Sequence, residues 1–186
     1  MSQESIKHAI LATVEAIQND PSMAKVRYQA ETQWEEDMRC TARVRDFEPT
    51  VVDEPAAFGG EDSAISPGDI VMVALGTCQE IMYVALASTM DIPIDEVKVD
   101  VTGDLDLHGL MGLNPDVPPG MLEMSYHVHI KSSAPEADLQ RLVDTVEAQC
   151  PLLDTLTRPV KVTGKVTMSG GTEYQGAGSY TKQRAK

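Results

Sequence analysis

One apolar segment constrains the fold of this chain most. Residues 67–90 read "PGDIVMVALGTCQEIMYVALASTM", and the helix-breaking sequence "DIP" follows directly. Ser66 is a preferred helix cap and Pro67 suits the first helical position, so the segment predicts one helix of roughly 24 residues, about 36 Å long. A helix that is apolar on nearly all sides needs to be covered by a sheet or by a partner subunit.

The length and composition of this segment also suit a membrane span, but its polar residues argue against one. Gln79 and Glu80 interrupt the middle, Asp69 lies in the first turn, and no basic residue flanks either end. Membrane helices carry few charges and are commonly bordered by lysine and arginine. We therefore expect no membrane association.

The remaining sequence predicts helices and hairpins. Helical spacing of apolar residues predicts amphipathic helices over 4–18 and from the cap Ser133 to Cys150, followed by a short helical turn "PLLDTL". Strict alternation of polar and apolar residues predicts the strands. They cover 26–34, 38–47, 97–107, 122–131 and 160–168. This order predicts an α+β fold with antiparallel sheet.

The 186 residues fit one domain with extensions at both ends. We expect a helical extension over 1–25, the main domain over 26–168, and a Gly- and Ser-rich flexible tail over 169–186.

Charge and cysteine content exclude several classes of function. The chain has 29 acidic and 15 basic residues, a net charge of −14, so it should repel phosphate backbones and bind no nucleic acid. Three cysteines (Cys40, Cys78 and Cys150) are too few for a disulfide framework and predict a reducing compartment. The first residues lack the pattern of a secretory leader, so we expect a cytoplasmic protein.

Two of these cysteines suggest redox chemistry. A buried cysteine is often only a small apolar residue, but Cys78 in the long helix is followed far along the chain by Cys150, at a helix end before proline. In thiol redox chemistry one cysteine attacks the oxidant and a second resolves the sulfenic acid as a disulfide. The attacker must be a thiolate, and lowering a thiol pKa by ~2.5 units requires about 3.4 kcal/mol.

The helix dipole cannot supply this energy, because its effect fades within the first turn and Cys78 lies about three turns in. An arginine within about 4 Å could supply ~4 kcal/mol. Arg39, Arg43 and Arg45 share one face of the predicted strand 38–47. We therefore expect a reactive Cys78 to depend on an arginine from this strand, whose other face packs Cys40 into the core.

At this point the sequence resembles a known family. "VDEPAAFGGEDSAISPGDIVMVALGTCQE", with "EAQCPLLDTL" some seventy residues later, is similar to the OsmC/Ohr family of thiol-dependent hydroperoxide reductases over about residues 26–168. The shared features are a double glycine before the helix-start proline, the ALGTC turn, and the Cys-Pro pair. ALGTC looks more like the broad OsmC-like branch than the organic-hydroperoxide specialists. The resemblance implies an intertwined OsmC-like homodimer, with antiparallel sheets wrapped around long central apolar helices, and no cofactor or metal.

The resemblance also implies roles for individual residues. Cys78 matches the peroxidatic cysteine, Cys150 the resolving one, and Arg39 the arginine that stabilises the thiolate, with Arg45 as a second candidate. The family's reductases carry a glutamate directly after the helix-start proline, which orients that arginine. Gly68 holds this position here. The candidate acids for the same role are Glu54 and Glu80.

These features predict a peroxidase that reduces organic hydroperoxides or hydrogen peroxide in oxidative or osmotic stress, through a Cys78–Cys150 disulfide. A dithiol such as a lipoyl group is the implied reductant. Since Gly68 replaces the family glutamate, an alternative is a catalytically weak module that binds a small hydrophobic ligand at the dimer cleft. A third hypothesis is a metal site formed by His127, His129 and Glu123, which share a strand face.

Overall fold

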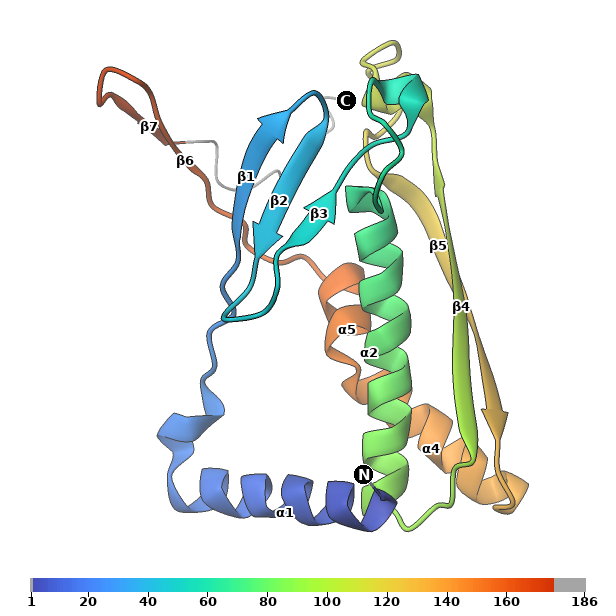
Figure 1. The fold of residues 1–186 in the computed structure, drawn as a ribbon. Coiled ribbons are helices and arrows are strands. Elements are labelled where there is room, and N and C mark those ends of the chain that lie inside the picture. The colour runs from blue at the N-terminus through green and yellow to red at the C-terminus, as the bar shows by residue number, and fades with distance from the viewer. Residues whose placement is uncertain (1, 176–186) are drawn as a thin grey trace.

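The computed structural model describes residues 2–175 (Figure 1). Its helices are α1 (Gln3–Asn19), α2 (Pro67–Thr89), α3 (Leu107–Leu110), α4 (Glu136–Gln149) and α5 (Pro151–Thr157), with 3-10 turns η1 (Pro21–Ala24) and η2 (Ala56–Phe58). Its strands are β1 (Glu31–Glu36), β2 (Arg39–Arg43), β3 (Thr50–Val52), β4 (Glu96–Leu105), β5 (Met121–Lys131), β6 (Lys165–Thr167) and β7 (Glu173–Gln175). Every strand pair is antiparallel, and in Figure 1 sheets β1–β2–β3 and β4–β5 lie on opposite sides of α2. The predicted α+β fold is confirmed.

The long helix α2 begins where the sequence predicts. The Ser66 hydroxyl accepts the Asp69 N–H, and the Asp69 carboxylate accepts the Ser66 N–H in return. Pro67 occupies the first turn, where the missing N–H has no helical partner. By length and composition α2 is the one helix within residues 2–175 that could cross a membrane. Its contacts with α1, α4 and β4 instead place it at the centre of the fold.

The chain covers only one face of α2. Four residues at a spacing of four are buried on that face: Leu75, Gln79, Tyr83 and Ala87. On the other face Val73 is 51% exposed and Ile81 is 67% exposed. Since apolar surface of this extent favours burial, the single chain leaves one side of its central helix to be covered by something else.

The core lies between α2 and α4. Tyr83, Ala87 and Ile92 are buried against Leu142 and Val146 of α4, and the predicted apolar stripe of α4 is confirmed. The predicted cap Ser133 is wrong, because α4 begins after Pro135, whose carbonyl accepts the Asp138 N–H without any side-chain cap.

The sheets differ from the predictions mainly at their ends. β4 and β5 form the expected long hairpin, with Val99 opposite Val128. The predicted strands 26–34, 38–47 and 160–168 are shorter in the structure, and β2 ends before Arg45, whose φ of 52° is left-handed. Strand β3 is absent from the predicted strands, because three residues are too few for alternation to show.

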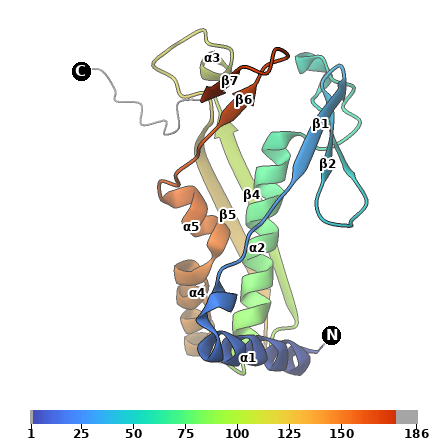
Figure 2. The ribbon, with the colours of Figure 1, turned by 90° about the vertical axis from the view of Figure 1, so that its left-hand side faces the viewer.

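The two terminal extensions contact the body differently. The side chain of Gln3 in α1 donates to the Ile92 carbonyl at 2.8 Å and accepts the Ile94 N–H at 3.0 Å. Lys7 of α1 pairs with Asp91 at 2.6 Å. At the other end β7, which lies inside the predicted tail 169–186, pairs with β6 of the predicted main domain. Residues 176–186 of this tail lie outside the described part of the chain. Figure 2 shows α1 crossing the end of α2.

Candidate functional site

The two predicted redox cysteines lie together. Cys78 is on α2, Cys150 is at the junction of α4 and α5, and their sulfur atoms are 3.7 Å apart. Both are free thiols; Cys150 is 1% exposed and Cys78 is half-buried. Cys150 continues the apolar stripe of Leu142 and Val146, so the packing of α4 on α2 delivers it to Cys78. The structure therefore brings the two thiols side by side, and their redox roles stay a prediction.

Within one chain the surroundings of Cys78 favour the neutral thiol. Burial raises its pKa, and Cys150 raises it further, while the backbone N–H of Leu152 hydrogen-bonds to the sulfur and lowers it. No cation within residues 2–175 is among the groups that act on this pKa. Since only the thiolate attacks a peroxide, the site of a single chain lacks a component that a reactive cysteine needs.

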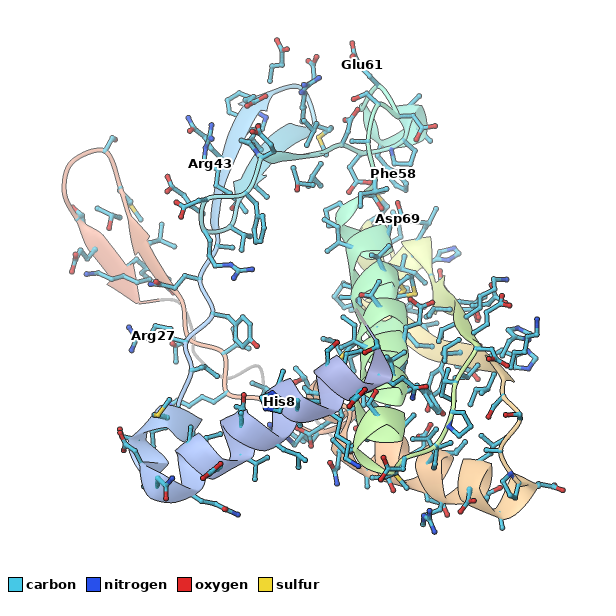
Figure 3. The ribbon with its side chains drawn as sticks, turned by 60° about the horizontal axis from the view of Figure 1, so that its bottom comes forward. His8, Arg27, Arg43, Phe58, Glu61 and Asp69 are labelled. Carbon is cyan, nitrogen blue, oxygen red and sulfur yellow. The ribbon has the colours of Figure 1, made fainter. Side chains whose placement is uncertain are left out.

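Arg39 and Arg43 lie on β2, in the β1–β2–β3 sheet, and Arg45 follows the end of this strand. Arg39 of β2 pairs with Glu35 of β1, with its Nε 3.5 Å from the carboxylate. The guanidinium of Arg45 lies over the Phe47 ring, 4.5 Å from its centroid. Figure 3 shows Arg43 on this sheet, across from the first turn of α2. No hydrogen bond joins an arginine to Cys78 in the described part of the chain.

The face of β2 expected in the core is not the buried one. Cys40 is half-buried, whereas its neighbour Thr41 on the arginine face is 8% exposed and bonds to Glu35. The prediction for Cys40 is therefore wrong in the single chain. The sheet does not close over α2, so its apolar face has no core of its own chain to fill.

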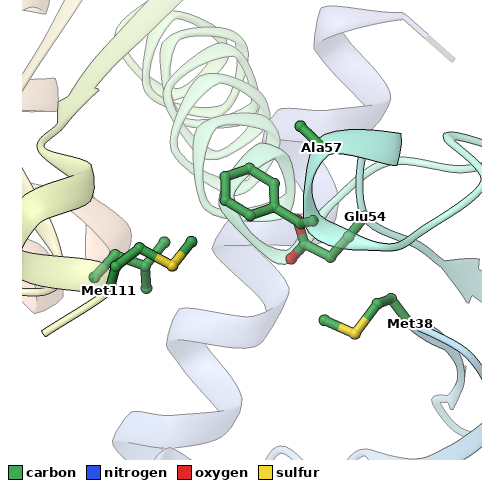
Figure 4. Close-up of a pocket in the computed structure, with 6 residues that line it drawn as sticks. Met38, Glu54, Ala57 and Met111 are labelled. Atoms are coloured by element: carbon green, nitrogen blue, oxygen red, sulfur yellow. The ribbon is translucent and has the colours of Figure 1, made fainter.

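The two candidate acids are in different environments. The Glu80 carboxylate accepts the Val99 N–H at 3.2 Å, which satisfies an edge group of β4. Glu54 lines a cavity of about 490 Å³ whose other walls are apolar (Figure 4). Those walls are formed by Met38, Ala57, Phe58, Leu110 and Met111. Neither acid contacts Arg39 in the described structure.

Space exists for a side chain at Gly68. A Cβ built there would lie 3.6 Å from the Met121 side chain and 3.6 Å from the Ser66 hydroxyl, both ordinary contacts. A Cβ at this position therefore meets no steric conflict.

The loop that leads to α2 is fixed by Asp53, whose burial and bonds to the loop backbone the sequence did not predict. Asp53 is 2% exposed and its carboxylate accepts the backbone N–H groups of Glu54, Glu61 and Ser63 and the Ser63 hydroxyl. The Ser63 bonds contribute most to lowering its pKa to about 2. A Cβ at Gly60 would lie 1.8 Å from the Glu54 carbonyl oxygen, so this close approach requires glycine.

The histidine pair has no metal-like arrangement. The rings of His127 and His129 lie side by side on the exposed face of β5, tilted by 40° with centroids 4.1 Å apart, and the His129 ring bonds to the Asp100 carboxylate at 3.0 Å. Asp100 also pairs with Lys98 at 2.7 Å. No three metal-ligating side chains gather among residues 2–175. The structure gives the third hypothesis no support.

A polar cluster beside Cys150 was missed by the sequence analysis. The Tyr126 hydroxyl of β5 donates to the carboxylate of Glu147 on α4, and the buried Tyr83 lies close enough for Glu147 and Cys150 to act on its pKa. Burial first, then these charges, raise the pKa of Tyr83 to about 12. From the sequence, the alternation of apolar residues in β5 and their spacing in the helices can assign each of these residues to a face of its own element. Only the packing of α4 brings the residues together.

Comparison with known proteins gives the family. A family model described as OsmC-like protein matches residues 60–165. The chain belongs to the OsmC-like family. The match includes Cys78 and Cys150 and excludes Arg39. Comparison with curated proteins gives no match.

Several solved structures share the OsmC-like fold. An OsmC like protein from Mycoplasma pneumoniae is 22% identical, with a TM-score of 0.62 over 71% of this chain and 88% of its own. An organic hydroperoxide resistance protein from Elizabethkingia anophelis is 15% identical, with a TM-score of 0.56 over 72% of this chain and 91% of its own. An organic hydroperoxide resistance protein from Legionella pneumophila is 17% identical, with a TM-score of 0.54 over 72% of this chain and 92% of its own. At these identities the likeness supports the fold alone.

Proposed function

We propose that this OsmC-like protein is a thiol peroxidase that reduces organic hydroperoxides or hydrogen peroxide. The observation that carries the proposal is the pair of free sulfurs, Cys78 and Cys150, at 3.7 Å. A disulfide needs about 2.05 Å between sulfurs, so a shift of about 1.7 Å suffices. The extended backbone at Cys150, between two helices, is a suitable place for that shift.

The chemistry is two steps on this pair. The Cys78 thiolate attacks the terminal peroxide oxygen, the O–O bond breaks, and one proton completes the departing alcohol, or water from hydrogen peroxide, leaving a Cys78 sulfenic acid. The Cys150 sulfur then attacks the Cys78 sulfur, the S–OH bond breaks, and hydroxide leaves as water with the Cys150 proton. A small dithiol, such as a lipoyl group, restores both thiols by exchange.

The missing cation is proposed to come from a second copy of the chain. In a homodimer the exposed face of α2 would be covered, and Arg39 of one copy would stabilise the Cys78 thiolate of the other. At about 4 Å an arginine would contribute ~4 kcal/mol before desolvation, which is the size of the shift required. Arg45 stays the second candidate. We place this chemistry in the cytoplasm, where reduced thiols persist.

The test is consumption of cumene hydroperoxide with excess dihydrolipoamide. Wild type should turn over, Cys78→Ser should lose activity, and Cys40→Ser serves as the matched control that keeps it. Equal rates in wild type and Cys78→Ser would contradict the proposal.

The alternative is a ligand-binding module without catalysis. The apolar cavity beside Glu54 and the raised pKa of Cys78 favour it. It predicts no peroxide turnover by wild type and saturable binding of a hydrophobic fluorophore, weakened by a bulky substitution of Ala57.

A further inference from the structure

The last turn of α4 is tied to the sheet by one polar contact. Tyr126 of β5 donates its hydroxyl hydrogen to the Glu147 carboxylate, and Glu147 lies three residues before Cys150, on a neighbouring position of the helix surface. Among residues 2–175 this is the only side-chain hydrogen bond between α4 and the β4–β5 sheet. The contact therefore bears directly on where the end of α4 lies.

The other contacts of this turn are apolar. Leu142 and Val146 are fully buried against Tyr83 and Ala87 of α2. Apolar packing is strong but not directional, so it holds α4 against α2 without fixing how far the helix slides or turns. A hydrogen bond depends steeply on distance and angle, and Tyr126 to Glu147 supplies that directional restraint.

The hydrogen bond from Tyr126 to Glu147 persists at neutral pH. Burial and the bond to Glu147 raise the pKa of Tyr126, so its hydroxyl keeps the proton that it donates. Figure 2 shows the elements that this hydrogen bond joins: β5 lies behind α5, and α4 continues into α5 beside α2. Cys150 lies at that continuation.

We propose that Tyr126 and Glu147 are positioning residues for the disulfide step, which hold the Cys150 sulfur within reach of Cys78. This inference rests on the proposed function. The restraint acts after the peroxide has reacted, because attack by Cys78 does not use Cys150. In the step concerned the Cys150 sulfur attacks the sulfenic sulfur, an S–S bond replaces the S–OH bond, and water leaves with the thiol proton.

The expected change in the rate of disulfide formation follows from the geometry of the reacting sulfurs. Misplacing a reacting atom by ~1 Å can slow a step by up to about 100-fold. Tyr126→Phe and Glu147→Ala remove the bond, so we expect each to slow disulfide formation about tenfold or more. Glu147→Gln keeps an acceptor oxygen for the Tyr126 hydroxyl and should restore the rate to within about threefold of wild type. Tyr28→Phe, at a tyrosine that is 93% exposed, is the matched control.

The experiment follows two species after one equivalent of cumene hydroperoxide. Sulfenic acid is trapped with dimedone and the Cys78–Cys150 disulfide is measured by mass spectrometry, both against time. The proposal predicts slower disulfide formation in Tyr126→Phe and Glu147→Ala with sulfenic acid formed at the wild-type rate. Unchanged disulfide rates, equal slowing of both steps, or a Glu147→Gln variant as slow as Glu147→Ala would each overturn it.

A parallel series uses diamide, which oxidises neighbouring thiols without any peroxide. If wild type forms the disulfide with diamide but ignores hydroperoxide, the proposed function fails while the comparison of variants still tests the positioning pair. The same order of rates supports the positioning role, and equal rates refute it.

Discussion

Replacing Gly60 by alanine should destabilise the protein more than adding a methyl group at any other position of this loop. A Cβ there would lie 1.8 Å from the Glu54 oxygen, 2.6 Å from its carbonyl carbon and 2.7 Å from the Asp53 carboxylate. An ordinary carbon–oxygen contact is ~3.3 Å, so the backbone must move by about 1.5 Å. Because backbone cannot rotate away as a flexible side chain can, we take the upper end of the usual overpacking cost, about 3 kcal/mol.

For a chain of this size 1 kcal/mol lowers the melting temperature by about 2–4 °C, so Gly60→Ala should melt about 6–12 °C below wild type. Differential scanning calorimetry measures this. Gly120→Ala is the matched control, because nothing lies within 4 Å of its added Cβ and its φ is ordinary. Equal melting temperatures for the two variants would refute the reasoning.

Other parts of the structure give three further predictions. Since the folded pKa of Asp53 is about 2, below the ordinary 3.8, its stabilising contribution is full above pH 3.8 and is lost as pH falls towards 2; urea titrations should show a smaller acid loss in Asp53→Asn than in wild type. A Cβ at Gly68 meets only ordinary contacts, and a glutamate there would orient the arginine proposed to come from the second copy; Gly68→Glu should therefore lower the Cys78 pKa, seen as faster alkylation by iodoacetamide at pH 7, and an unchanged or slower rate would contradict an arginine near the thiol. Leu142→Ala should cost about 2–5 kcal/mol in unfolding free energy, against less than about 0.5 kcal/mol for the exposed Leu113→Ala, both measured by urea denaturation.

The sequence alone predicted the elements whose signals are local and strong. Ser66 and Pro67 fix the start of α2 through capping and backbone geometry, and both signals are read within four residues. Alternation over ten or more residues identified β4 and β5 for the same reason. The three residues of β3 are too few for such a pattern, and the true start of α4 depends on Pro135, not on the better capping residue before it.

The residues of the candidate site could be predicted one by one, but not how they lie relative to one another. Helical spacing predicted a helix that ends at Cys150, and the family resemblance paired this residue with Cys78. That the stripe of Leu142 and Val146 packs on α2 and brings Cys150 to Cys78 is seen only in the structure. The bond of Tyr126 to Glu147 depends on the relative position of a strand and a helix, which no local pattern encodes. Likewise Arg39 was singled out because it matches the family arginine, on a strand face that carries three arginines. The side of α2 on which its sheet lies is set by the whole chain and by what covers the exposed face.

The proposed function depends most on Cys78 as the group that peroxide oxidises. Free thiols per chain are counted under denaturing conditions before and after one equivalent of cumene hydroperoxide, in wild type and in Cys78→Ser. We predict that wild type loses two thiols rapidly, with Cys78 and Cys150 joined and Cys40 still free, and that the variant shows no such rapid loss of two thiols. An unchanged thiol count in wild type would contradict the account.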